Sequence, residues 1–317
     1  MSAILPYVVR RILTALPTIA IFACFVFLLQ KLLPGDPVLA MAGEDRDPAT
    51  LAALRIQYHL DDALPLQFLR WAGDALQGNL GESLRNHDSV LHLIAQKLPV
   101  TLELAVLSTL FSVLIGVPAG ILAAAKKGSL WDNLARGAAL WGVSIPTFWF
   151  GIVLIILVSV NLHLLPASGY APISEDPWQN IRTMILPAFV LGNAQAGILM
   201  RHTRSSMLEV LRQDYVRTAR AKGLPELRVV MGHAFRNALA PLVTVTAVLL
   251  GQLLAGAVLT EQVFSIPGFG KMLVDAVFNR DYAVVQGVAL CTGVGFILLN
   301  LLADVAQLVL NPRLRAS

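Results

Sequence analysis

Six long apolar stretches alternate with polar segments along the chain. Each is long enough to cross the hydrocarbon core of a bilayer, for which about 20 residues of helix suffice. Lipid offers the backbone no hydrogen-bonding partners, so we expect these stretches to be helices. Their uninterrupted apolar character also argues against the alternating pattern of a membrane β-barrel. The charge-free cores are Ile12–Gln30, Leu104–Ala125, Gly137–Leu162, Thr183–Met200, Ala238–Thr260 and Tyr282–Ala303.

Composition supports an all-α membrane protein. Apolar residues make up 56% of the chain, charged residues make up 14%, and the mean hydropathy is +0.68. Soluble domains carry about 25% charged residues. The net charge of +4 is small. A nucleic-acid-binding protein would need a concentrated basic surface on a soluble fold, which the sequence does not indicate. Cys24 and Cys291 both lie in apolar runs, which favours core packing over a disulfide or thiolate metal site.

The distribution of Lys and Arg predicts the orientation of the helices. Cation-rich segments alternate with cation-poor segments: Arg182 alone follows the third span, and Lys271 and Arg280 follow the fifth. Because cytoplasmic loops carry the excess of cations, we expect both termini to be cytoplasmic. The cations on the predicted cytoplasmic side are Arg10, Arg11, Lys126, Lys127, Arg136, Arg201, Arg204, Arg212, Arg217, Arg220, Lys222, Arg228, Arg236, Arg313 and Arg315.

The N-terminal apolar run has two interpretations. Arg10 and Arg11, the apolar run and the downstream Ala40-Met41-Ala42 resemble a cleaved signal peptide. However, the run is longer than the usual signal core, and Pro34-Gly35-Asp36-Pro37 separates it from that site. We therefore expect a retained first transmembrane helix.

Residues 34–98 form the only sizeable segment predicted on the extracytoplasmic side. Apolar positions recur at helical spacing after Pro48 and again after Pro65, and the stretch from Asp88 to Leu98 is a third helix candidate. His87 and His92 lie five residues apart, off a common helical face, which argues against a metal site. We expect a small helical segment packed on the outer ends of the bundle.

The polar loop 201–237 is the most distinctive part of the chain. Ser205–Lys222 lacks Gly and Pro and predicts one amphipathic helix. Gly223 would terminate that helix, and Pro225 suits the first turn of the next. The second helix would continue to Asn237 and into the fifth span. The predicted stripe of the first helix is Leu208, Leu211, Tyr215 and Ala219, and the second helix would contain Val229, Val230 and Ala234.

Between these two helices lies a surface of small residues and cations. Small side chains let another protein approach closely, and the cations orient it. A basic helix lying on anionic lipid is the alternative. Lipid binding would not require the break at Gly223 and Pro225, so we favour docking of a partner protein. The predicted docking residues are Arg217, Thr218, Ala219, Arg220, Ala221, Lys222 and Gly223.

The order of motifs resembles the permease subunits of binding-protein-dependent ABC importers, in the dipeptide, oligopeptide and nickel branch. The resemblance covers nearly the whole chain, with Asn79 where the branch usually has Asp and Ala283 where it often has Pro. Arg217 stands where the wider importer motif begins with Glu, and Leu239-Ala240-Pro241 lies farther from Gly223 than in that motif. The matching segments are RRILTALPTIAIFACFVFLLQKLLPGDP, GNLGESL, LLPASGY, MILPAFVLG, YVRTARAKGL, HAFRNALAPLVT, EQVFSIPGFGKMLVDAVFNRDY and NPRLR.

This resemblance implies a type I ABC importer permease fold and a shared mechanism. Two ATPase subunits would use ATP and Mg²⁺, bind the loop, and rock the helices between inward-facing and outward-facing states. An extracytoplasmic solute-binding protein would deliver the substrate, and a second, homologous permease subunit would complete a heterodimer. The chain has no phosphate-binding loop of its own, because Gly270-Lys271 is followed by Met272. We therefore expect a transporter subunit that is not an enzyme and binds no cofactor.

The implied organisation has three parts: a first helix with the periplasmic segment (1–98), a transmembrane core (99–309) with its coupling loop (201–237), and a cytoplasmic tail (310–317). Polar groups in or beside the spans are candidates for the substrate pathway, although helix–helix hydrogen bonding is their usual role. The candidates are Glu103, Asn193, Gln195, Gln252, Glu261 and Asn300.

Two other function classes fit the sequence less well. An ion-coupled secondary transporter would need midplane acidic residues and usually an internal repeat, and the span interiors lack Asp and Glu. A membrane enzyme would need a catalytic constellation. Short peptides are the expected substrate of the branch, with nickel chelates or glutathione as alternatives.

Overall fold

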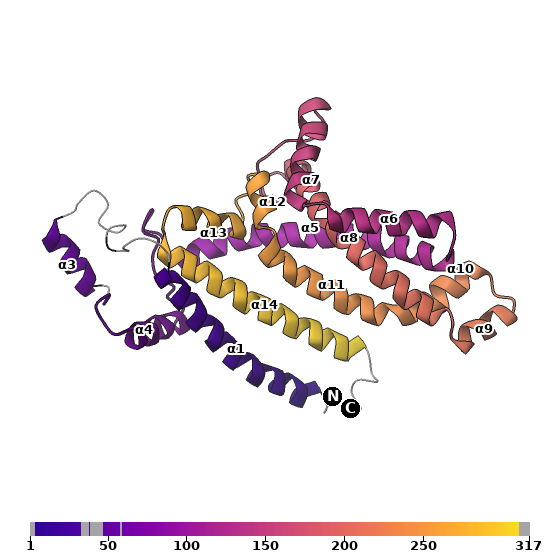
Figure 1. Cartoon of the computed structure of the whole chain (residues 1–317), viewed down its shortest axis with the longest axis horizontal. Helices are drawn as coiled ribbons and strands as arrows, with labels where there is room; N and C mark the ends of the chain where they lie inside the picture. Colours follow the sequence, from indigo (N-terminus) through magenta and orange to yellow (C-terminus); the bar gives the residue numbers. More distant parts are fainter. Residues whose placement is uncertain (1–3, 33–37, 39–46, 58, 311–317) are drawn as a thin grey trace.

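The computed structural model describes residues 4–32, 38, 47–57 and 59–310. Within them the chain forms long helices lying side by side, with some of the short helices at two opposite ends and α7 (Thr147–Leu154) projecting from the middle of the bundle (Figure 1). Among the described residues, five helices are long and apolar enough to cross a membrane, and they contain Val9–Leu29, Val90–Ala125, Pro177–Val210, Glu226–Leu253 and Tyr282–Leu302. A sixth span is available if one bent helix pair is counted as a span.

The long helices build the bundle, and α8 is its centre. In the most apolar window of α8, 72% of the residues are buried, against 33% or less in the other four spans. The bundle helices are α1 (Ile4–Leu32), α5 (Val90–Ala125), α6 (Leu130–Ser144), α8 (Pro177–Val210), α11 (Arg236–Gly256) and α14 (Tyr282–Leu310).

Small residues allow α8 to pack closely on its neighbours. A Cβ atom added to Gly192 would lie 2.7 Å from the Ser108 carbonyl oxygen of α5, and one added to Gly116 of α5 would lie 2.7 Å from that of Ala196. These distances are too short for any side chain, so glycine sets the spacing between the two helices. Close approach through small residues is the usual mode of helix association in membranes.

The predicted third span is not one helix. α6 ends at Ser144, and α7 (Thr147–Leu154) follows at an angle of 100°, continued by the π-helical η1 (Ile155–Asn161). Ile145 adopts an extended conformation before Pro146, as residues before proline prefer. The prediction of an unbroken helix over Gly137–Leu162 was therefore wrong, and α7 projects away from the bundle (Figure 1).

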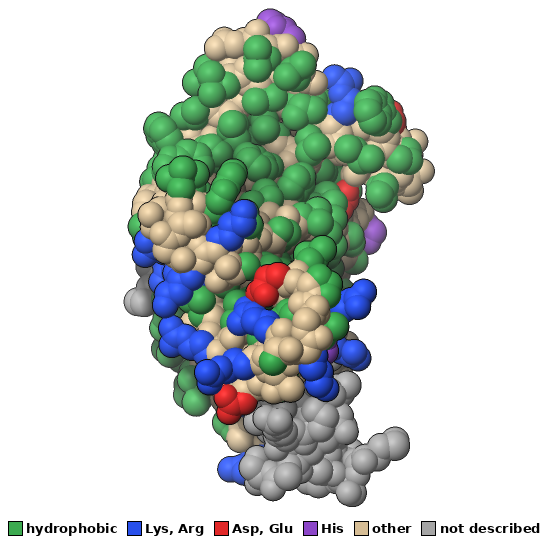
Figure 2. Space-filling model, turned by 90° about the vertical axis from the view of Figure 1, so that its right-hand side faces the viewer, with side chains coloured by type: hydrophobic (Ala, Val, Ile, Leu, Met, Phe, Trp, Pro, Cys, Tyr) green, Lys and Arg blue, Asp and Glu red, His purple; other side chains and the backbone are tan. Residues whose placement is uncertain are grey.

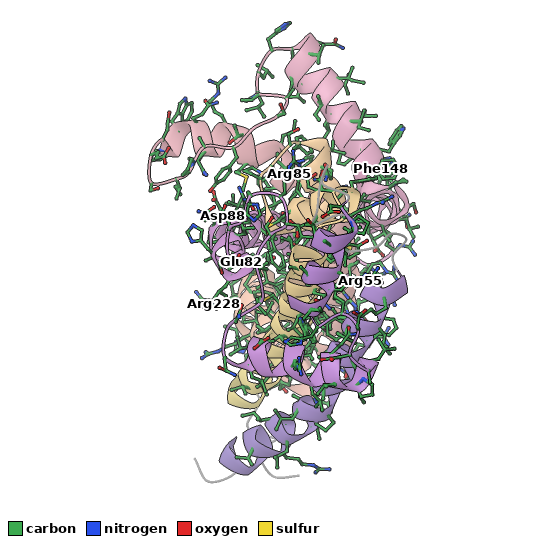
Figure 3. The ribbon with its side chains drawn as sticks, turned by 90° about the vertical axis from the view of Figure 1, so that its left-hand side faces the viewer. Arg55, Glu82, Arg85, Asp88, Phe148 and Arg228 are labelled. Carbon is green, nitrogen blue, oxygen red and sulfur yellow. The ribbon has the colours of Figure 1, made fainter. Side chains whose placement is uncertain are left out.

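The segment between the first two spans is helical, as predicted. It contains α3 (Pro48–Gln57) and α4 (Leu64–Leu76), followed by a loop in which Glu82 and Ser89 form an isolated antiparallel bridge. Figure 3 shows Glu82, Arg85 and Asp88 in this loop. The third candidate helix is instead the first part of α5, so the predicted boundary at residue 98 lies inside a helix. Of the predicted tail 310–317, only Leu310 is among the described residues.

The short helices of the two ends complete the fold. One end carries α3, α4 and α13 (Phe269–Phe278), which follows α12 (Val258–Val263). The opposite end carries α9 (Asp214–Ala221), α10 (Glu226–Arg228) and η2 (Val229–Phe235). α1 starts and α14 finishes toward this second end (Figure 1).

Candidate functional site

The predicted docking loop forms a compact elbow, residues 211–235, between α8 and α11. α8 ends at Val210, a turn over Leu211–Gln213 redirects the chain, and α9 follows. The single helix expected over Ser205–Lys222 was therefore wrong. Gln213 is extended, with φ −71° and ψ 148°, and it starts α9 in a new direction.

The turn changes which residues face inward. Val216 and Ala219 are buried against Val229, whereas Tyr215, which was placed on the inward stripe, is exposed. Its hydroxyl instead accepts a hydrogen bond of 3.0 Å from the amide nitrogen of Asn237. The buried trio gives the elbow a small apolar core of its own, in contact with Val210, Leu211 and Leu224.

The break at Gly223 is confirmed. Gly223 has a φ of +76°, a left-handed conformation that favours glycine, and it lies directly after the last turn of α9. A Cβ atom there would meet open space, with nothing within 4 Å. The constraint is therefore the backbone conformation rather than steric room. Pro225 then caps α10, and the helix continues through η2 into α11, as the sequence predicted.

An ion pair closes the elbow. The Arg220 guanidinium donates hydrogen bonds of 2.7 and 3.1 Å to the two carboxylate oxygens of Glu226. Both side chains are half-exposed, at 41% and 58%. Arg220 thus joins α9 to α10 across the break at Gly223 and is already engaged within the chain.

The outer surface of the elbow carries the other predicted docking residues. Arg217, Thr218, Ala221 and Lys222 are all exposed. Arg217 has only a loose contact of 3.6 Å with Asp214. Among the described residues, no hydrogen bond or ion pair engages the Lys222 side chain. Figure 2 shows Lys and Arg side chains gathered over this end, with mainly apolar side chains beyond it.

The six pathway candidates do not form one cluster. Glu103 accepts hydrogen bonds from the Tyr170 hydroxyl at 2.8 Å and from the Asn180 amide at 2.6 Å. Burial, and then this hydrogen bond and the negative charge of Glu103, raise the pKa of Tyr170 to about 12. The phenol therefore stays protonated and ties the loop after η1 to α5.

Glu261 is fully buried. Its carboxylate accepts a 2.6 Å hydrogen bond from the Thr101 hydroxyl and a 2.7 Å hydrogen bond from the backbone amide of Lys271. The Thr101 hydroxyl in turn accepts one of 2.8 Å from the amide of Phe269. Glu261 and Thr101 together satisfy the free amides at the start of α13 and fasten that helix to α5.

The remaining candidates lie in different surroundings. Gln195 is buried and donates a 2.8 Å hydrogen bond to the Leu249 carbonyl, which links α8 to α11. Asn193 is half-buried beside Gly142 of α6, and Gln252 is exposed on α11. Asn300 lines a cavity of about 510 Å³ between α1 and α14.

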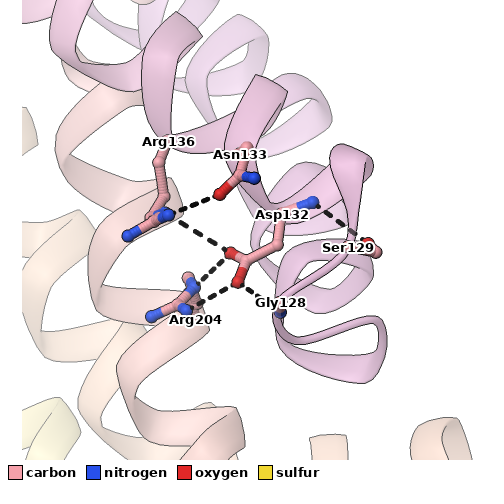
Figure 4. A network of polar contacts seen from close by, with 6 residues as sticks. All are labelled: Gly128, Ser129, Asp132, Asn133, Arg136 and Arg204. Atoms are coloured by element: carbon pink, nitrogen blue, oxygen red, sulfur yellow. Dashed lines mark hydrogen bonds and ion pairs between the residues drawn. The ribbon is translucent and has the colours of Figure 1, made fainter.

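Sequence reasoning missed two buried carboxylates. Asp132 at the start of α6 binds Arg204 of α8, with 2.7 Å to Nε and 2.9 Å to Nη2 (Figure 4). Asp281 accepts a hydrogen bond from the buried hydroxyl of Ser83 and so anchors the 80–89 loop. One signal for Asp132 was present: Ser129, three residues earlier, is the pattern of a helix cap, and Ser129 does cap α6.

Metal ligands are sparse in the described part of the chain, where no group of three His, Cys, Asp or Glu side chains could hold an ion. His92 contacts Gln96 at 2.8 Å.

Comparison with known proteins identifies the architecture. The family described as the inner membrane component of binding-protein-dependent transport systems matches residues 116–316, and its N-terminal counterpart matches residues 4–105. The chain belongs to this family. The predicted family resemblance is thereby confirmed, and with it the assignment as a permease component rather than an ATPase.

Curated relatives cover almost the whole permease. The dipeptide transport system permease protein DppB of Escherichia coli (strain K12) is 42% identical over 335 residues, covering 98% of this chain and 99% of the relative. The di/tripeptide transport system permease protein DppB of Pseudomonas aeruginosa (strain UCBPP-PA14) is 44% identical over 332 residues, covering 98% and 99%.

The fold also matches a solved transporter. A structure of the MetNI methionine ABC transporter, described as inward facing, aligns with 69% of this permease and 96% of its own chain. The TM-score is 0.58 at 17% identity. This likeness confirms the predicted all-α, type I ABC importer permease fold.

Proposed function

We propose that this chain is one of two permease subunits of an ATP-driven importer that moves short peptides across the cytoplasmic membrane. The proposal rests on the family membership and on relatives named for dipeptide and di/tripeptide transport. The observation that carries the mechanism is the elbow: an exposed basic surface on a folded unit at the end of the most buried helix.

In this mechanism the elbow end lies in the cytoplasm, together with both termini. Its excess of cations favours that side. Two ATPase subunits bind ATP and Mg²⁺ and contact the surface formed by Arg217–Gly223. A solute-binding protein meets the opposite end, near α13 and the 80–89 loop.

Alternating access then follows from the coupling of the two ends. ATP binding favours the closed ATPase pair, and the elbows follow the ATPases because they are bound to them. The helix bundle shifts toward the outward-facing state, since a ligand shifts an equilibrium by its differential affinity for the two states. Hydrolysis and release restore the inward-facing state.

The partner permease completes the substrate path. We expect a second, homologous subunit, in a heterodimer, to cover the apolar side chains of α6 and α7 that this chain leaves exposed, such as Trp141, Phe148 and Trp149. Glu103, Asn193, Gln195, Gln252, Glu261 and Asn300 remain the polar candidates along the path, with Gln252 the one that is exposed in this chain.

The test is reconstitution of the complete importer in liposomes. Uptake of a labelled dipeptide should require ATP, the solute-binding protein and this chain together. Thermal stabilisation of the binding protein by dipeptides, but not by nickel chelates or glutathione, should define the substrate class. Uptake that persists without the ATPases would overturn the proposal.

A further inference from the structure

A buried carboxylate joins the inner ends of α6 and α8. The two oxygens of Asp132 accept the paired hydrogen bonds from Arg204, and Oδ2 accepts a further one of 2.9 Å from the Gly128 amide (Figure 4). Arg136 lies farther away, at 3.8 Å from Oδ1. The Asp132 side chain is 3% exposed and that of Arg204 is 21% exposed.

This contact is specific in its geometry. The planar guanidinium presents two parallel donors, which fit a carboxylate in only one relative orientation. Removal of Arg204 leaves the buried Asp132 carboxylate with only the Gly128 amide and the longer contact to Arg136, which is unfavourable. The two helices are therefore held in register at this point, and not merely attracted to each other.

A second, independent contact holds the same two helices farther along. A Cβ atom on Gly197 of α8 would lie 2.6 Å from the Ala139 carbonyl oxygen of α6. One on Gly142 of α6 would lie 3.0 Å from the Asn193 carbonyl oxygen of α8. Ion pair and close backbone packing together fix α6 against α8 at two levels.

α8 leads directly into the elbow. Its last residue, Val210, packs against the buried core of the elbow together with Leu211. A displacement of the elbow therefore acts directly on α8, as it does on α11 through η2. α6 does not lead directly into the elbow, because α7, η1 and α8 lie between them along the chain. Its outer end leads to the 100° bend and to α7.

We propose that Asp132 and Arg204 act as a clamp that makes α6 move with α8 and the elbow as one body, so that motion of the ATPases reaches α7. Both are positioning residues, which act through the helices that they join. The clamp deepens the proposed function and rests on its assignment of the elbow as the ATPase contact.

The first experiment measures the motion directly. Spin labels are placed at Leu140 on α6 and at Leu227 on α10, an elbow residue outside the docking surface Arg217–Gly223. Both side chains are exposed in this chain, and the distance is measured in the complete importer. The distance between them should be the same without nucleotide and with nucleotide trapped at the ATPase sites. A change larger than about half a helical pitch, roughly 3 Å, would overturn the clamp.

The second experiment uses Asp132→Asn and Arg204→Gln, with Arg201→Gln as the matched control. Arg201 is an exposed cation on the same helix, one turn earlier. We expect the two clamp variants to broaden the label distance and to lower the peptide transported per ATP hydrolysed by about tenfold, a typical strength of coupling between linked sites. The control should leave both readouts unchanged.

The outcomes separate the clamp from the proposed function. If Asp132→Asn assembles and retains both the label distance and the transport per ATP, the clamp is wrong and the importer mechanism stands. If the clamp variants fail to assemble, the label distance in the unmodified importer, with and without trapped nucleotide, still tests the clamp. If the ATPases do not bind the elbow at all, the proposed function fails before the clamp is tested.

Discussion

The Arg220 guanidinium and the Glu226 carboxylate form a two-point ion pair that spans the break at Gly223. The pair holds α9 and α10 at a fixed angle, so Arg220 shapes the elbow. A cation on the surface of this elbow can therefore serve the docking of an ATPase in two ways, by direct contact or by fixing the shape that the ATPase meets. The two ways give different mutational results.

Arg220→Glu should weaken ATPase attachment by distorting the elbow. The free energy of unfolding should change by no more than about 1 kcal/mol, because the pair is half-exposed and surface pairs contribute little. Arg220→Glu combined with Glu226→Arg should restore co-purification of the ATPases. Failure of the double variant to restore it would mean that Arg220 touches the ATPase itself.

Lys222 allows a test of direct contact between the elbow and the ATPase. Its side chain is exposed and engages no other described residue, so Lys222→Glu should weaken ATPase attachment without changing the shape of the elbow. The effect should diminish at high ionic strength, because exposed charges are screened by salt. Equal co-purification of ATPases with the variant and the unmodified chain, at low salt, would place Lys222 outside the contact.

Gly223→Val should impair coupling through backbone strain. A β-branched residue at a φ of +76° costs about 1 to 3 kcal/mol, whereas the space around the site is open. Gly223→Asn is the matched control, since asparagine tolerates the left-handed conformation. ATP turnover stimulated by the loaded binding protein should fall in the valine variant and largely persist in the asparagine variant. Equal loss in both would point to a steric requirement in the assembled importer.

Glu261 should make the stability of the end of the bundle that carries α13 depend on pH. Burial raises the pKa of this carboxyl, while the hydrogen bonds from Thr101 and the Lys271 amide act in the opposite direction. With a raised pKa the folded chain holds the proton more readily than the unfolded chain. The contribution of the Glu261 carboxyl to the free energy of unfolding is therefore complete below the ordinary carboxyl pKa. It is lost as the pH rises through the raised pKa.

The measurement compares the thermal unfolding of the unmodified importer with that of Glu261→Gln over that pH range. The stability of the unmodified importer, relative to the variant, should fall as the pH rises above the ordinary carboxyl range. If the stabilities of the importer and the variant change with pH in parallel, the pKa of Glu261 does not differ between the folded and unfolded states. Glu261→Ala should be less stable than either at every pH, because it leaves the Thr101 hydroxyl and the α13 amides unpaired.

Gly197→Val should prevent the close approach of α6 and α8. The added Cβ alone would lie 2.6 Å from the Ala139 carbonyl oxygen. We expect destabilisation of a few kcal/mol, as for other overpacked interiors. Gly137→Ala is the control on α6, because nothing lies within 4 Å of its Cβ position. Thermal unfolding of the purified importer should separate the two variants clearly.

Hydropathy was sufficient to predict the bundle but not the bend. Four of the six apolar cores predicted from the sequence each lie within one helix, because lipid-embedded backbone must satisfy its own hydrogen bonds. Gly137–Leu162 breaks at Ile145 and Pro146, and Ala238–Thr260 breaks at Ala257, between α11 and α12. The third stretch contains Pro146, but a proline alone does not show that a helix breaks. Pro118 and Pro187 also lie in apolar stretches, and the helices around them continue. What distinguishes Pro146 is that Ile145 before it is extended, whereas Val117 before Pro118 and Leu186 before Pro187 are helical.

In the elbow, too, the sequence predicted one change of direction and missed another. Gly223 and Pro225 predicted a break in the helix, because their backbone preferences are local. The turn over Leu211–Gln213 contains neither residue type. That turn rotates α9 so that Val216 and Ala219 meet Val229, a contact between residues that only the fold brings together.

The partners of the buried carboxylates could not be predicted from the sequence for the same reason. Asp132 pairs with a residue 72 positions away, and Glu261 with one 160 positions away. Nothing in their neighbouring residues indicates such a partner. Glu261 attracted attention as a substrate contact because a carboxylate near a membrane is costly. Its hydrogen bonds to Thr101 and the start of α13 account for its burial.

The length of α8 gives the elbow mechanical leverage. Its 34 residues form a rod of about 51 Å, whereas the hydrocarbon core is about 30 Å thick. In the proposed orientation, the surplus carries the elbow beyond the lipid surface, at the end of α8. A tilt of a few degrees about the middle of the membrane therefore sweeps the tip farther than any point within the bilayer. In the proposed mechanism, a large movement of the ATPases would then become a shorter displacement of α8 within the bilayer.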